Sequence, residues 1–536
     1  MTSPEIPRLL GRGMTMGDQL ARHARTIGDR VAFRFEDESR TYAQLDERVS
    51  RLAGALLERG VRSGDRVAVL GLNSLEVIET FFACARLGAI CVPVNFRLVA
   101  DEIGYVLADS GSRACVVGAQ LAEQLAKARN QLDTETACLV YGGDSQAVAL
   151  AGPGAEDYER ALAEVSPEFE EVPVDEHEPA FIMYTSGTTG RPKGAVLTHF
   201  NLLLHAFSNM ATLGVTNDDR VWLAAAPLFH IAGLSGMLPN LLLGGRTVLL
   251  PSGQFDPAAT LDVMERERVS SCFLVPAQWQ AICAVPDIAE RDLSSLRKIS
   301  WGAAPASTTL LRTMIDTFPQ AEVTTAFGQT ECSPVTTVLR GEDSIRKIGS
   351  VGTPMLNVEV RLVDDDMNDV AQGEVGEIVY RGPMVMKEYW NKPVETAEAF
   401  RGGWFHSGDL VRQDEDGYYY VVDRKKDMII SGGENIYCAE VENVLAAHPK
   451  IGEVALIGMP DERWGETPLA VIAPRRSDDP PTPADLDAWC ADRLARYKRP
   501  RRVAIVPALP RNPSGKVLKT QLRSDREAGK LDVRPT

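Results

Sequence analysis

The stretch YTSGTTGRPKG at residues 184–194 constrains the chain more than any other, because its composition suits the binding of a polyanion. It combines glycines and hydroxyl side chains with one lysine: Thr185, Ser186, Gly187, Thr188, Thr189, Gly190, Lys193 and Gly194. Glycines let backbone N–H groups approach a phosphate without a Cβ in the way, hydroxyls add donors, and the lysine adds positive charge. Apolar residues 181–184 and 195–197 flank the stretch, so we expect a loop held between two strands.

The residues around the lysine separate this stretch from the Walker A loop. That loop needs Ser or Thr directly after its lysine, at the start of a helix, whereas Lys193 stands between Pro192 and Gly194. A run of Gly, Ser and Thr is by itself also typical of a surface turn. The other motifs of the chain therefore have to decide between the two interpretations.

Length and charge exclude several classes of protein. At 536 residues the chain is too long for one core, which predicts at least two domains. A formal net charge of −17 and a pI of about 5.1 argue against sequence-nonspecific binding of nucleic acid. The nine cysteines form no CxxC pair, which indicates a reducing compartment without a zinc site. Since neither a signal peptide nor a long apolar span is visible, we expect a cytoplasmic protein without a transmembrane segment.

The N-terminal part alternates between strand and helix patterns. Residues 31–35 alternate like a strand, and Thr41 then caps a helix that Gly60 ends. Its apolar residues recur at helical spacing: Leu45, Val49, Leu52 and Leu56. Three further runs continue as strand, helix and strand: residues 67–70, 77–85 and 90–94. This βαβ order predicts an α/β fold with a parallel sheet covered by helices.

Changes in character divide the rest of the chain. Residues 140–180 are polar and proline-bearing, which predicts a surface connection. Residues 345–420 carry alternating apolar runs between turn clusters, which predicts antiparallel sheet in a small β-barrel-like part. Charge and then glycine concentrate in VVDRKKDMIISGGENIY, and mixed helix and strand follow. We place the domain boundary there, with a large N-terminal domain of residues 1–423 and a small, mobile α+β domain of residues 424–536.

Later motifs present polar residues suited to chemistry. TAFGQTE sets Thr330 beside Glu331, a hydroxyl and a carboxylate of the kind that Mg²⁺ prefers. PLFHIAGL sets His230 in an apolar segment, where a lone histidine is usually a buried structural residue. GGWFHSGDL contains Asp409, and NPSGKVLKT presents Lys516 in a turn before a short helix. Taken one at a time, these residues are also typical of ordinary loops.

In this order the motifs resemble the adenylate-forming superfamily of acyl-CoA synthetases, luciferases and peptide-synthetase adenylation domains. The resemblance covers essentially the whole chain and is closest to bacterial fatty-acid–CoA ligases. It implies that three runs bind the nucleotide: Thr185, Ser186, Gly187, Thr188, Thr189, Gly190 and Lys193; Gly302, Ala303 and Ala304; and Thr325, Ala326, Phe327 and Gly328. Phe327 stands where many members have tyrosine, so the ring that stacks on adenine is kept and a hydroxyl is lost.

The resemblance also implies individual roles. Glu331 and Thr185 would bind the metal ion, Thr330 would contact phosphate, and His230 would border the acyl pocket. In the C-terminal part, Asp409 and Arg424 would hold the ribose, and Lys426 would lie at the hinge. Gly432 and Gly433 would line the pantetheine tunnel. Lys516 would act in the first chemical step. We therefore expect Lys516, Thr330, Glu331 and His230 to be the catalytic residues.

The implied chemistry activates a carboxylic acid. The substrate carboxylate attacks the α-phosphorus of ATP, which gives an acyl adenylate and pyrophosphate, and the thiol of coenzyme A then displaces AMP. Since the first step brings an anion up to a polyanion, the protein has to supply positive charge and positioning. The implied cofactors are ATP and Mg²⁺, with coenzyme A as a substrate.

We expect the acid to be a medium- or long-chain fatty acid, because Ala232 and Gly233 leave room for an alkyl chain near His230. Two alternatives stay open: an acyl-AMP ligase that loads a carrier protein, and an aromatic-acid–CoA ligase. Plant hydroxycinnamate ligases carry a tyrosine at the position of Ala232. A non-enzymatic nucleotide-binding protein is disfavoured, since Lys193, Glu331 and Lys516 are all retained. We expect no nucleic-acid partner, and we leave a homodimer and peripheral membrane contact open.

Replacing Lys516 tests the two-step cycle, because this lysine is implied to act in the first step only. Lys516→Ala should slow pyrophosphate release by about 10² to 10³, the usual cost of losing one charge-stabilising contact in the transition state. Thioester formation from supplied acyl-AMP and coenzyme A should survive. Gly433→Trp should do the reverse and let acyl-AMP accumulate. Equal slowing of both half-reactions by Lys516→Ala would contradict the assignment.

Overall fold

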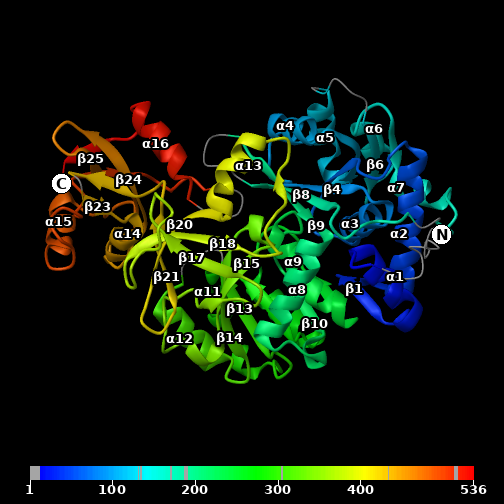
Figure 1. Cartoon of the computed structure of the whole chain (residues 1–536), viewed down its shortest axis with the longest axis horizontal. Helices are drawn as coiled ribbons and strands as arrows, with labels where there is room; N and C mark the ends of the chain where they lie inside the picture. The colour runs from blue at the N-terminus through cyan, green and yellow to red at the C-terminus, as the bar shows by residue number, and fades with distance from the viewer. Residues whose placement is uncertain are drawn as a thin grey trace, which may run out of the picture. The chain divides into compact units, whose positions relative to one another are not determined.

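The structure is a computed structural model that describes residues 13–130, 132, 136–169, 172–185, 191–302, 306–432, 434–511 and 517–535. The chain divides into two compact units (Figure 1). The N-terminal unit comprises residues up to 359 together with 380–405, and the C-terminal unit comprises 360–379 together with residues from 406 onward. Both mix helices and strands, so the expected α/β class, with a large N-terminal and a smaller C-terminal part, is confirmed.

Two sheets form the N-terminal unit. The first has nine strands in the order β16 (Thr353–Pro354), β15 (Val335–Leu339), β14 (Glu322–Gly328), β13 (Lys298–Gly302), β12 (Ser271–Leu274), β10 (Val221–Ala224), β11 (Arg246–Leu249), β1 (Val31–Phe35) and β2 (Glu38–Thr41). The second has eight strands in the order β19 (Glu388–Tyr389), β9 (Lys193–Thr198), β8 (Pro179–Thr185), β4 (Ile90–Val94), β3 (Arg66–Leu70), β5 (Ser112–Gly118), β6 (Ala137–Tyr141) and β7 (Ala155–Asp157). The inner strands are parallel, as the βαβ pattern predicts, and antiparallel strands finish one or both edges.

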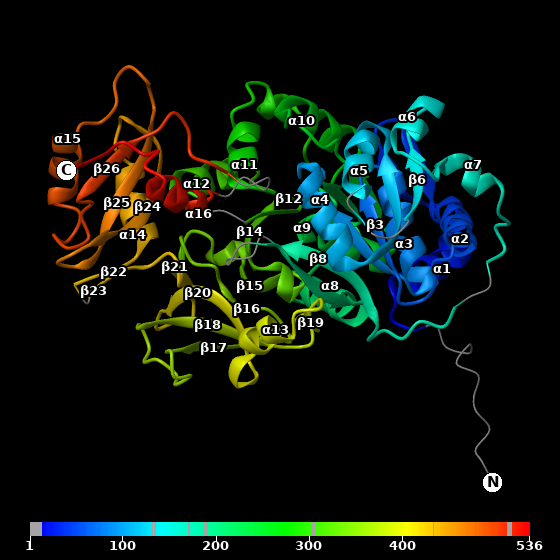
Figure 2. The ribbon, with the colours of Figure 1, turned by 90° about the horizontal axis from the view of Figure 1, so that it is seen from above.

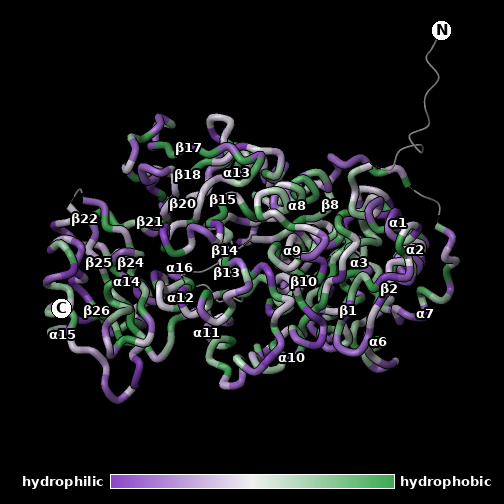
Figure 3. Tube along the Cα trace, turned by 90° about the horizontal axis from the view of Figure 1, so that it is seen from below, coloured by the Kyte–Doolittle hydropathy of each residue, from purple (hydrophilic) through white to green (hydrophobic). Residues whose placement is uncertain are grey.

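Helices cover both sheets and also lie between them. Those of the N-terminal unit are α1 (Met16–Ile27), α2 (Tyr42–Glu58), α3 (Leu75–Leu87), α4 (Ala100–Ser110), α5 (Ala122–Arg129), α6 (Ser145–Leu150), α7 (Tyr158–Ala163), α8 (His199–Leu213), α9 (Ile231–Leu243), α10 (Pro257–Arg266), α11 (Pro276–Cys283), α12 (Thr308–Thr317) and α13 (Pro393–Ala399). Because α3 contacts β3 and β4 of one sheet and β1 of the other, it is buried between the sheets (Figure 1), and Figure 2 shows it beside β3. The interior strands and helices can be followed as hydrophobic stretches in Figure 3.

The predicted helix after Thr41 is present as α2. The Thr41 hydroxyl accepts the Gln44 N–H, and the Gln44 side chain accepts the Thr41 N–H, which completes a capping box. The four apolar residues that predicted this helix are all buried: Leu45, Val49, Leu52 and Leu56. The helical spacing of these apolar residues therefore predicted the buried face of α2 correctly.

The prediction for residues 140–180 was incomplete. This stretch is not only a surface connection, because it contains α6, β7 and α7. Tyr158 at the start of α7 is fully buried, and its hydroxyl donates a hydrogen bond of 2.7 Å to Glu79 on α3. Polar composition concealed these short elements, since their stability depends on contacts with residues distant in sequence.

Glu79 is the polar centre of this N-terminal core. Its side chain is fully buried and accepts hydrogen bonds from Arg48 at 2.6 Å and from Arg40 at 3.3 Å, in addition to that from Tyr158. Burial raises the pKa of Glu79, although Arg48 acts in the opposite direction. The carboxylate thus joins α2, α3 and α7 through groups that would be costly to leave unpaired.

The C-terminal unit contains two further sheets. The four strands β17 (Glu359–Val363), β18 (Val375–Arg381), β20 (Phe405–Gln413) and β21 (Tyr419–Arg424) are the alternating runs that predicted a barrel-like part. The other sheet has the order β23 (Glu434–Ile436), β22 (Ile429–Ser431), β25 (Gly465–Pro474), β26 (Arg502–Ile505) and β27 (Val533–Pro535), and β24 (Ile451–Asp461) pairs with β25. Its helices are α14 (Cys438–Ala446), α15 (Pro483–Ala491) and α16 (Lys519–Glu527).

The grouping of the four-stranded sheet differs from the sequence-based division. We placed residues before 424 in the N-terminal domain, whereas β17, β18, β20 and β21 group mainly with the C-terminal unit. One reason is α14, which contacts both β21 and β24. The position of a moving boundary stays a prediction.

Glu79→Leu should destabilise the N-terminal unit by about 3 to 5 kcal/mol, because it leaves the half-buried Arg40 and Arg48 and the fully buried Tyr158 hydroxyl without their carboxylate. Urea denaturation followed by tryptophan fluorescence would measure the change. Glu159→Gln is the matched control: Glu159 pairs with the same Arg48 but is 59% exposed, and loss of such a pair costs about 1 kcal/mol or less. Equal losses of unfolding free energy for the two substitutions would show that the buried Glu79 contributes no more to stability than an exposed ion pair.

Candidate active site

Strands β8 and β9 hold the glycine-rich stretch at its two ends. Thr185 is the cross-strand partner of Lys193 and Tyr184 that of Gly194, so the two strands predicted to flank the stretch are present. A Cβ on Gly194 would lie 2.4 Å from Ile182 Cγ2, which explains this glycine by packing. The predicted residues Ser186, Gly187, Thr188, Thr189 and Gly190 lie outside the described residues.

A cluster around Asp109 supports the two ends of this loop. Asp109, at the end of α4, accepts hydrogen bonds from Tyr184 at 2.8 Å and from Lys392 at 2.7 Å. Tyr105 donates to the Pro192 carbonyl at 3.0 Å. Burial, and then Asp109, raise the pKa of Tyr184, so its hydroxyl remains a donor. Tyr184 and Pro192, near the two ends of the stretch, are therefore held by side chains that lie outside the motif.

Glu331 lies in the short 3-10 turn Thr330–Cys332 and is 8% exposed. Its Oε1 accepts hydrogen bonds from the Tyr389 hydroxyl at 2.9 Å and from the Thr185 hydroxyl at 3.4 Å. Its backbone carbonyl accepts the Met386 N–H at 2.7 Å. The structure thus brings together Glu331 and Thr185, the two residues that the sequence assigned to the metal.

The sequence analysis missed Tyr389. Besides its contact with Glu331, the ring of Tyr389 lies 4.5 Å from Nζ of Lys193, in the range of a cation–π interaction. Burial and the nearby Glu331 carboxylate raise the pKa of Tyr389, so the phenol stays protonated. The sequence offers only an aromatic residue that follows the charged pair Lys387 and Glu388, a signal that does not distinguish it from many other tyrosines.

The donor set around Glu331 fits Mg²⁺. No group of three or more His, Cys, Asp or Glu side chains gathers into a metal site within the described ranges. Mg²⁺ needs no such cage, since it is commonly bound by one or two carboxylates together with substrate phosphates and water. A buried carboxylate beside a hydroxyl and a lysine therefore meets the requirement, and ATP would complete the coordination.

Close backbone contacts explain the glycines of the proposed nucleotide region. Gly302 in β13 pairs with Ala326 in β14, and a Cβ on Gly302 would lie 2.4 Å from the Ala326 carbonyl oxygen. Gly328 has φ +154°, and a Cβ there would lie 2.0 Å from the Pro334 carbonyl oxygen. Phe327, directly before Gly328, is half-buried. Ala303 and Ala304 lie outside the described residues.

Thr325 is a further candidate in β14. Its hydroxyl is buried and has no hydrogen-bond partner in the part of the chain that the structure describes. A buried hydroxyl of this kind is unusual, because nearly all buried polar groups are satisfied. The unpaired hydroxyl agrees with the predicted contact between Thr325 and the nucleotide. That contact stays a prediction.

His230 is the N-cap residue of α9. Its Nδ1 accepts the Ala232 N–H at 3.2 Å, and Phe229 before it packs edge-on against Phe96 with the ring centroids 5.3 Å apart. A Cβ on Gly233 would lie 2.4 Å from the Pro227 carbonyl oxygen. The small size of Gly233 is therefore required by the packing of α9 on the preceding loop, and it no longer supports room for an alkyl chain.

His205 on α8 is a second residue that the sequence did not indicate. Its Nε2 accepts the Val335 N–H at 3.0 Å, four residues after Glu331. Complete burial lowers the pKa of His205 to about 3, so the ring is neutral near pH 7 and can accept this hydrogen bond. His205 thus anchors the strand that follows the turn of Glu331.

In the C-terminal unit, Asp409 and Arg424 are cross-strand partners on β20 and β21. Arg424 Nε lies 2.5 Å from Asp409 Oδ1, and Asp409 is 3% exposed. Ser407 accepts the Asp409 N–H at 3.0 Å and donates to the Ile378 carbonyl at 2.5 Å. The structure thus places the two residues predicted to hold the ribose side by side.

The remaining predicted residues of this unit are only partly described. Burial lowers the pKa of Lys426. Gly432 has φ +62°, and a Cβ there would lie 2.6 Å from the Trp464 ring, so a larger residue would be strained. Gly433 and Lys516 lie outside the described residues.

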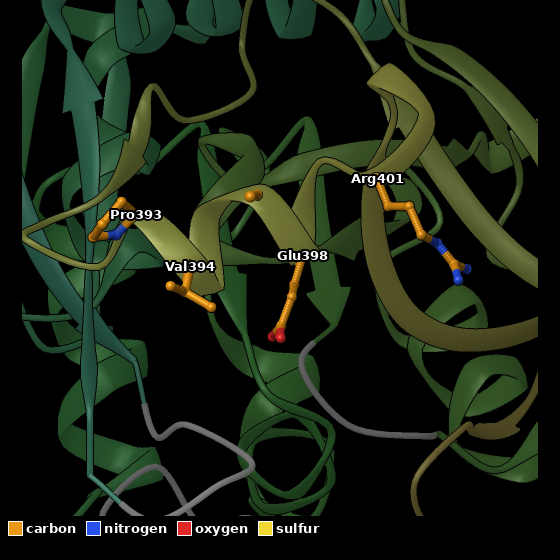
Figure 4. Close-up of a pocket in the computed structure, with 5 residues that line it drawn as sticks. Pro393, Val394, Glu398 and Arg401 are labelled. Atoms are coloured by element: carbon orange, nitrogen blue, oxygen red, sulfur yellow. The ribbon is translucent and has the colours of Figure 1, made fainter.

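A surface hollow on the N-terminal unit is lined by a different set of residues. It runs along α13 and the short turn after it, and Pro393, Val394, Ala397, Glu398 and Arg401 line it (Figure 4). None of these residues belongs to the predicted site, and we assign it no part in the reaction. No described helix combines the length and hydropathy needed to span a membrane.

Comparison with known families decides the identity of this arrangement. Residues 20–390 match the family described as AMP-binding enzyme, and residues 440–516 match its C-terminal domain. The chain belongs to the AMP-binding enzyme family. The resemblance to adenylate-forming enzymes seen in the sequence is confirmed.

Three relatives cover nearly all of the chain. A feruloyl-CoA synthase from Amycolatopsis sp is 44% identical over 96% of this chain and 99% of its own length. An indoleacetate–CoA ligase from Aromatoleum aromaticum is 39% identical over 95% and 98%. A long-chain-fatty-acid–CoA ligase from Mycobacterium tuberculosis is 38% identical over 92% and 94%.

Solved structures give the same answer for the fold. The o-succinylbenzoate CoA synthetase of Bacillus subtilis, in complex with its acyl-adenylate intermediate, matches with a TM-score of 0.81 and 32% identity over 94% of this chain and 97% of that chain. The same enzyme has been solved with ATP and a magnesium ion.

As a member of the AMP-binding enzyme family, the chain is an ATP-dependent acid–CoA ligase that forms AMP. Its cofactors are ATP and Mg²⁺, and its other substrates are a small carboxylic acid and coenzyme A. The expected fatty acid is not confirmed, because the relatives include ligases of aromatic acids as well as of fatty acids.

Glu331→Gln should raise the Mg²⁺ concentration needed for half-maximal pyrophosphate release by about tenfold or more, a typical cost of disturbing a metal site. The fold should tolerate the change, since Gln Oε1 can still accept from Tyr389. Glu322→Gln is the control: Glu322 lies at the start of β14 and pairs with Lys298. An unchanged Mg²⁺ titration for Glu331→Gln would move the metal elsewhere.

Proposed function

We propose that the chain activates an aromatic carboxylic acid, such as a hydroxycinnamate or an arylacetate, and converts it to the CoA thioester. The observation that carries this proposal is the 44% identity to a feruloyl-CoA synthase across nearly the whole of both chains. The 39% identity to an indoleacetate–CoA ligase points in the same direction. This was the alternative to the fatty acid in the sequence analysis.

The segment around His230 supports an aromatic acid. Phe229 and Phe96 form an edge-to-face pair, a geometry that leaves ring surfaces suited to packing against another aromatic group. Arg97 lies 4.7 Å from the Phe96 ring and adds a cation beside this pair. Gly233, which had suggested an alkyl chain, has a packing explanation instead.

The first chemical step forms the acyl adenylate. One oxygen of the substrate carboxylate attacks the α-phosphorus of ATP, and the bond to the β-phosphate bridging oxygen breaks to release pyrophosphate. Lys193 supplies positive charge beside the glycine-rich stretch, and Thr330 and Glu331 supply oxygen ligands in the same unit. Mg²⁺, when bound, would neutralise phosphate charge. By resemblance, Lys516 steadies the carboxylate against the α-phosphate.

The second step forms the thioester. The thiol of coenzyme A loses its proton to solvent, its sulfur attacks the acyl carbon, and AMP leaves with the electron pair of the broken C–O bond. The family resemblance assigns Asp409 and Arg424 to the ribose, Lys426 to the hinge, and Gly432 and Gly433 to the path of the pantetheine arm. These assignments, the domain boundary after residue 423 and a cytoplasmic location stay proposals.

A second candidate substrate is a medium- or long-chain fatty acid. The 38% identity to a long-chain-fatty-acid–CoA ligase supports this candidate. A third candidate reaction transfers the acyl group to a carrier protein. Release of AMP with free coenzyme A as the only acceptor would show that a carrier protein is not required.

A panel of acids tests the proposal. Pyrophosphate release should give a kcat/KM for ferulate, coumarate or indoleacetate that is about tenfold or more above that for octanoate to palmitate, the selectivity a hydrophobic pocket can supply. Higher values for the fatty acids would reject the aromatic acid and restore the original expectation.

Phe229→Leu sharpens this test. It removes the aromatic pair, worth about 0.5 to 1.5 kcal/mol, and should lower the ratio of aromatic to aliphatic kcat/KM several-fold. Phe200→Leu is the control, because Phe200 on α8 contacts the ring of His177 instead. A ratio that both variants leave unchanged would remove Phe229 from the acyl pocket.

A further inference from the structure

Tyr389 contacts both charged side chains that are assigned to the phosphates and the metal. Its hydroxyl donates to Glu331 at 2.9 Å, and its ring lies 4.5 Å from the Lys193 ammonium. The residue is 7% exposed, so solvent competes little with either contact. One side chain therefore touches a carboxylate and an ammonium that come from separate strands and turns.

The backbone around Tyr389 is fixed on several sides. Tyr389 pairs with Ala195 in the ladder between β19 and β9, and its own N–H donates to the Thr396 hydroxyl at 3.0 Å. Trp390 N–H donates to the Gly194 carbonyl at 2.7 Å, and Met386 N–H donates to the Glu331 carbonyl at 2.7 Å. The ring is thus carried by a segment joined to both the loop strand and the turn of Glu331.

The hydrogen bonds of Glu331 are distributed unequally between its oxygens. Tyr389 and Thr185 both donate to Oε1. Within the described ranges, Oε2 accepts no side-chain or backbone hydrogen bond. A carboxylate held by one oxygen has its rotamer fixed and keeps the other oxygen for a ligand, which is how partners of metal-binding carboxylates usually act.

We propose that Tyr389 is a positioning residue of the adenylation step, which aims Oε2 of Glu331 at the metal of Mg²⁺–ATP and keeps Lys193 apart from Glu331. The hydroxyl serves the first role and the ring face serves the second. Without the ring, Lys193 could pair directly with Glu331, and the charge meant for phosphate would be neutralised inside the protein. This inference rests on the proposed metal role of Glu331.

Tyr389→Phe separates the two roles, because it removes the hydroxyl and keeps the ring. The Mg²⁺ concentration for half-maximal pyrophosphate release should rise about tenfold, in line with the loss of one partner of a metal ligand. The KM for ATP at saturating Mg²⁺ should change little. Tyr389→Leu removes the ring as well and should also raise the KM for ATP.

Metal binding without turnover provides the second readout. Binding of Mn²⁺ can be followed by electron paramagnetic resonance in the presence of ATP and in the absence of any acid. Tyr389→Phe should weaken it about tenfold. Because no acid is added, this measurement is independent of whether the substrate is aromatic, so the failure of one proposal is distinguishable from the failure of the other.

Tyr158→Phe is the matched control. Tyr158 is a fully buried tyrosine that, like Tyr389, donates to a buried glutamate; its partner is Glu79, at 2.7 Å. The control should lose stability to a similar degree and keep the wild-type Mg²⁺ titration and Mn²⁺ binding. A shift of equal size in this variant would mean that general destabilisation moves the metal dependence, and would overturn the proposal.

A double-mutant cycle completes the test. If Tyr389 acts through Glu331, the variant carrying both Glu331→Gln and Tyr389→Phe should bind Mn²⁺ no more weakly than Glu331→Gln alone. Additive losses, or wild-type metal binding by Tyr389→Phe, would overturn the proposal. Should Tyr389→Phe fail to fold, Tyr389→Met also removes the hydroxyl and is judged by the same Mn²⁺ measurement.

Discussion

A loop that binds a polyanion has to keep its backbone N–H groups for the ligand, so the residues on either side must fix its position. Here the strand register does so, since Thr185 and Lys193 face each other across β8 and β9. The carbonyl of Gly194 is held by Trp390, and the Asp109 cluster holds Tyr184. Because Tyr389 of β19 also donates to Glu331, the residue proposed to bind the metal and the strand β9 that follows the glycine-rich stretch share one support.

Much of this arrangement could be predicted from the sequence, because it follows from local patterns. Period and capping located α2 and the parallel strands, and the order of the motifs indicated the family and most candidate residues. Tyr389, His205 and Asp109 could not be found in this way. Each acts through a partner far away in the chain, and an isolated tyrosine, histidine or aspartate carries no pattern that distinguishes it from ordinary core or surface residues.

Small residues show why the acid was harder to predict than the reaction. A glycine near a substrate segment suggests free space, but Gly233, Gly302 and Gly328 each face a backbone carbonyl at less than the contact distance of a Cβ. Their size is required by the fold whether or not a ligand lies nearby. The nature of the acid depends instead on the side chains that line its pocket. The Phe96 and Phe229 pair, which we propose for this role, comes from separate segments.

The shortness of β19 and β16 affects more than the site. Each has two residues and forms the last strand at one edge of its sheet. An edge strand with a long row of free N–H and C=O groups can pair with another chain and start aggregation. Two residues offer almost no such row, and Pro354 in β16 has no N–H to donate. The enzyme can therefore end two large sheets in this way without exposing an edge that would recruit a second molecule.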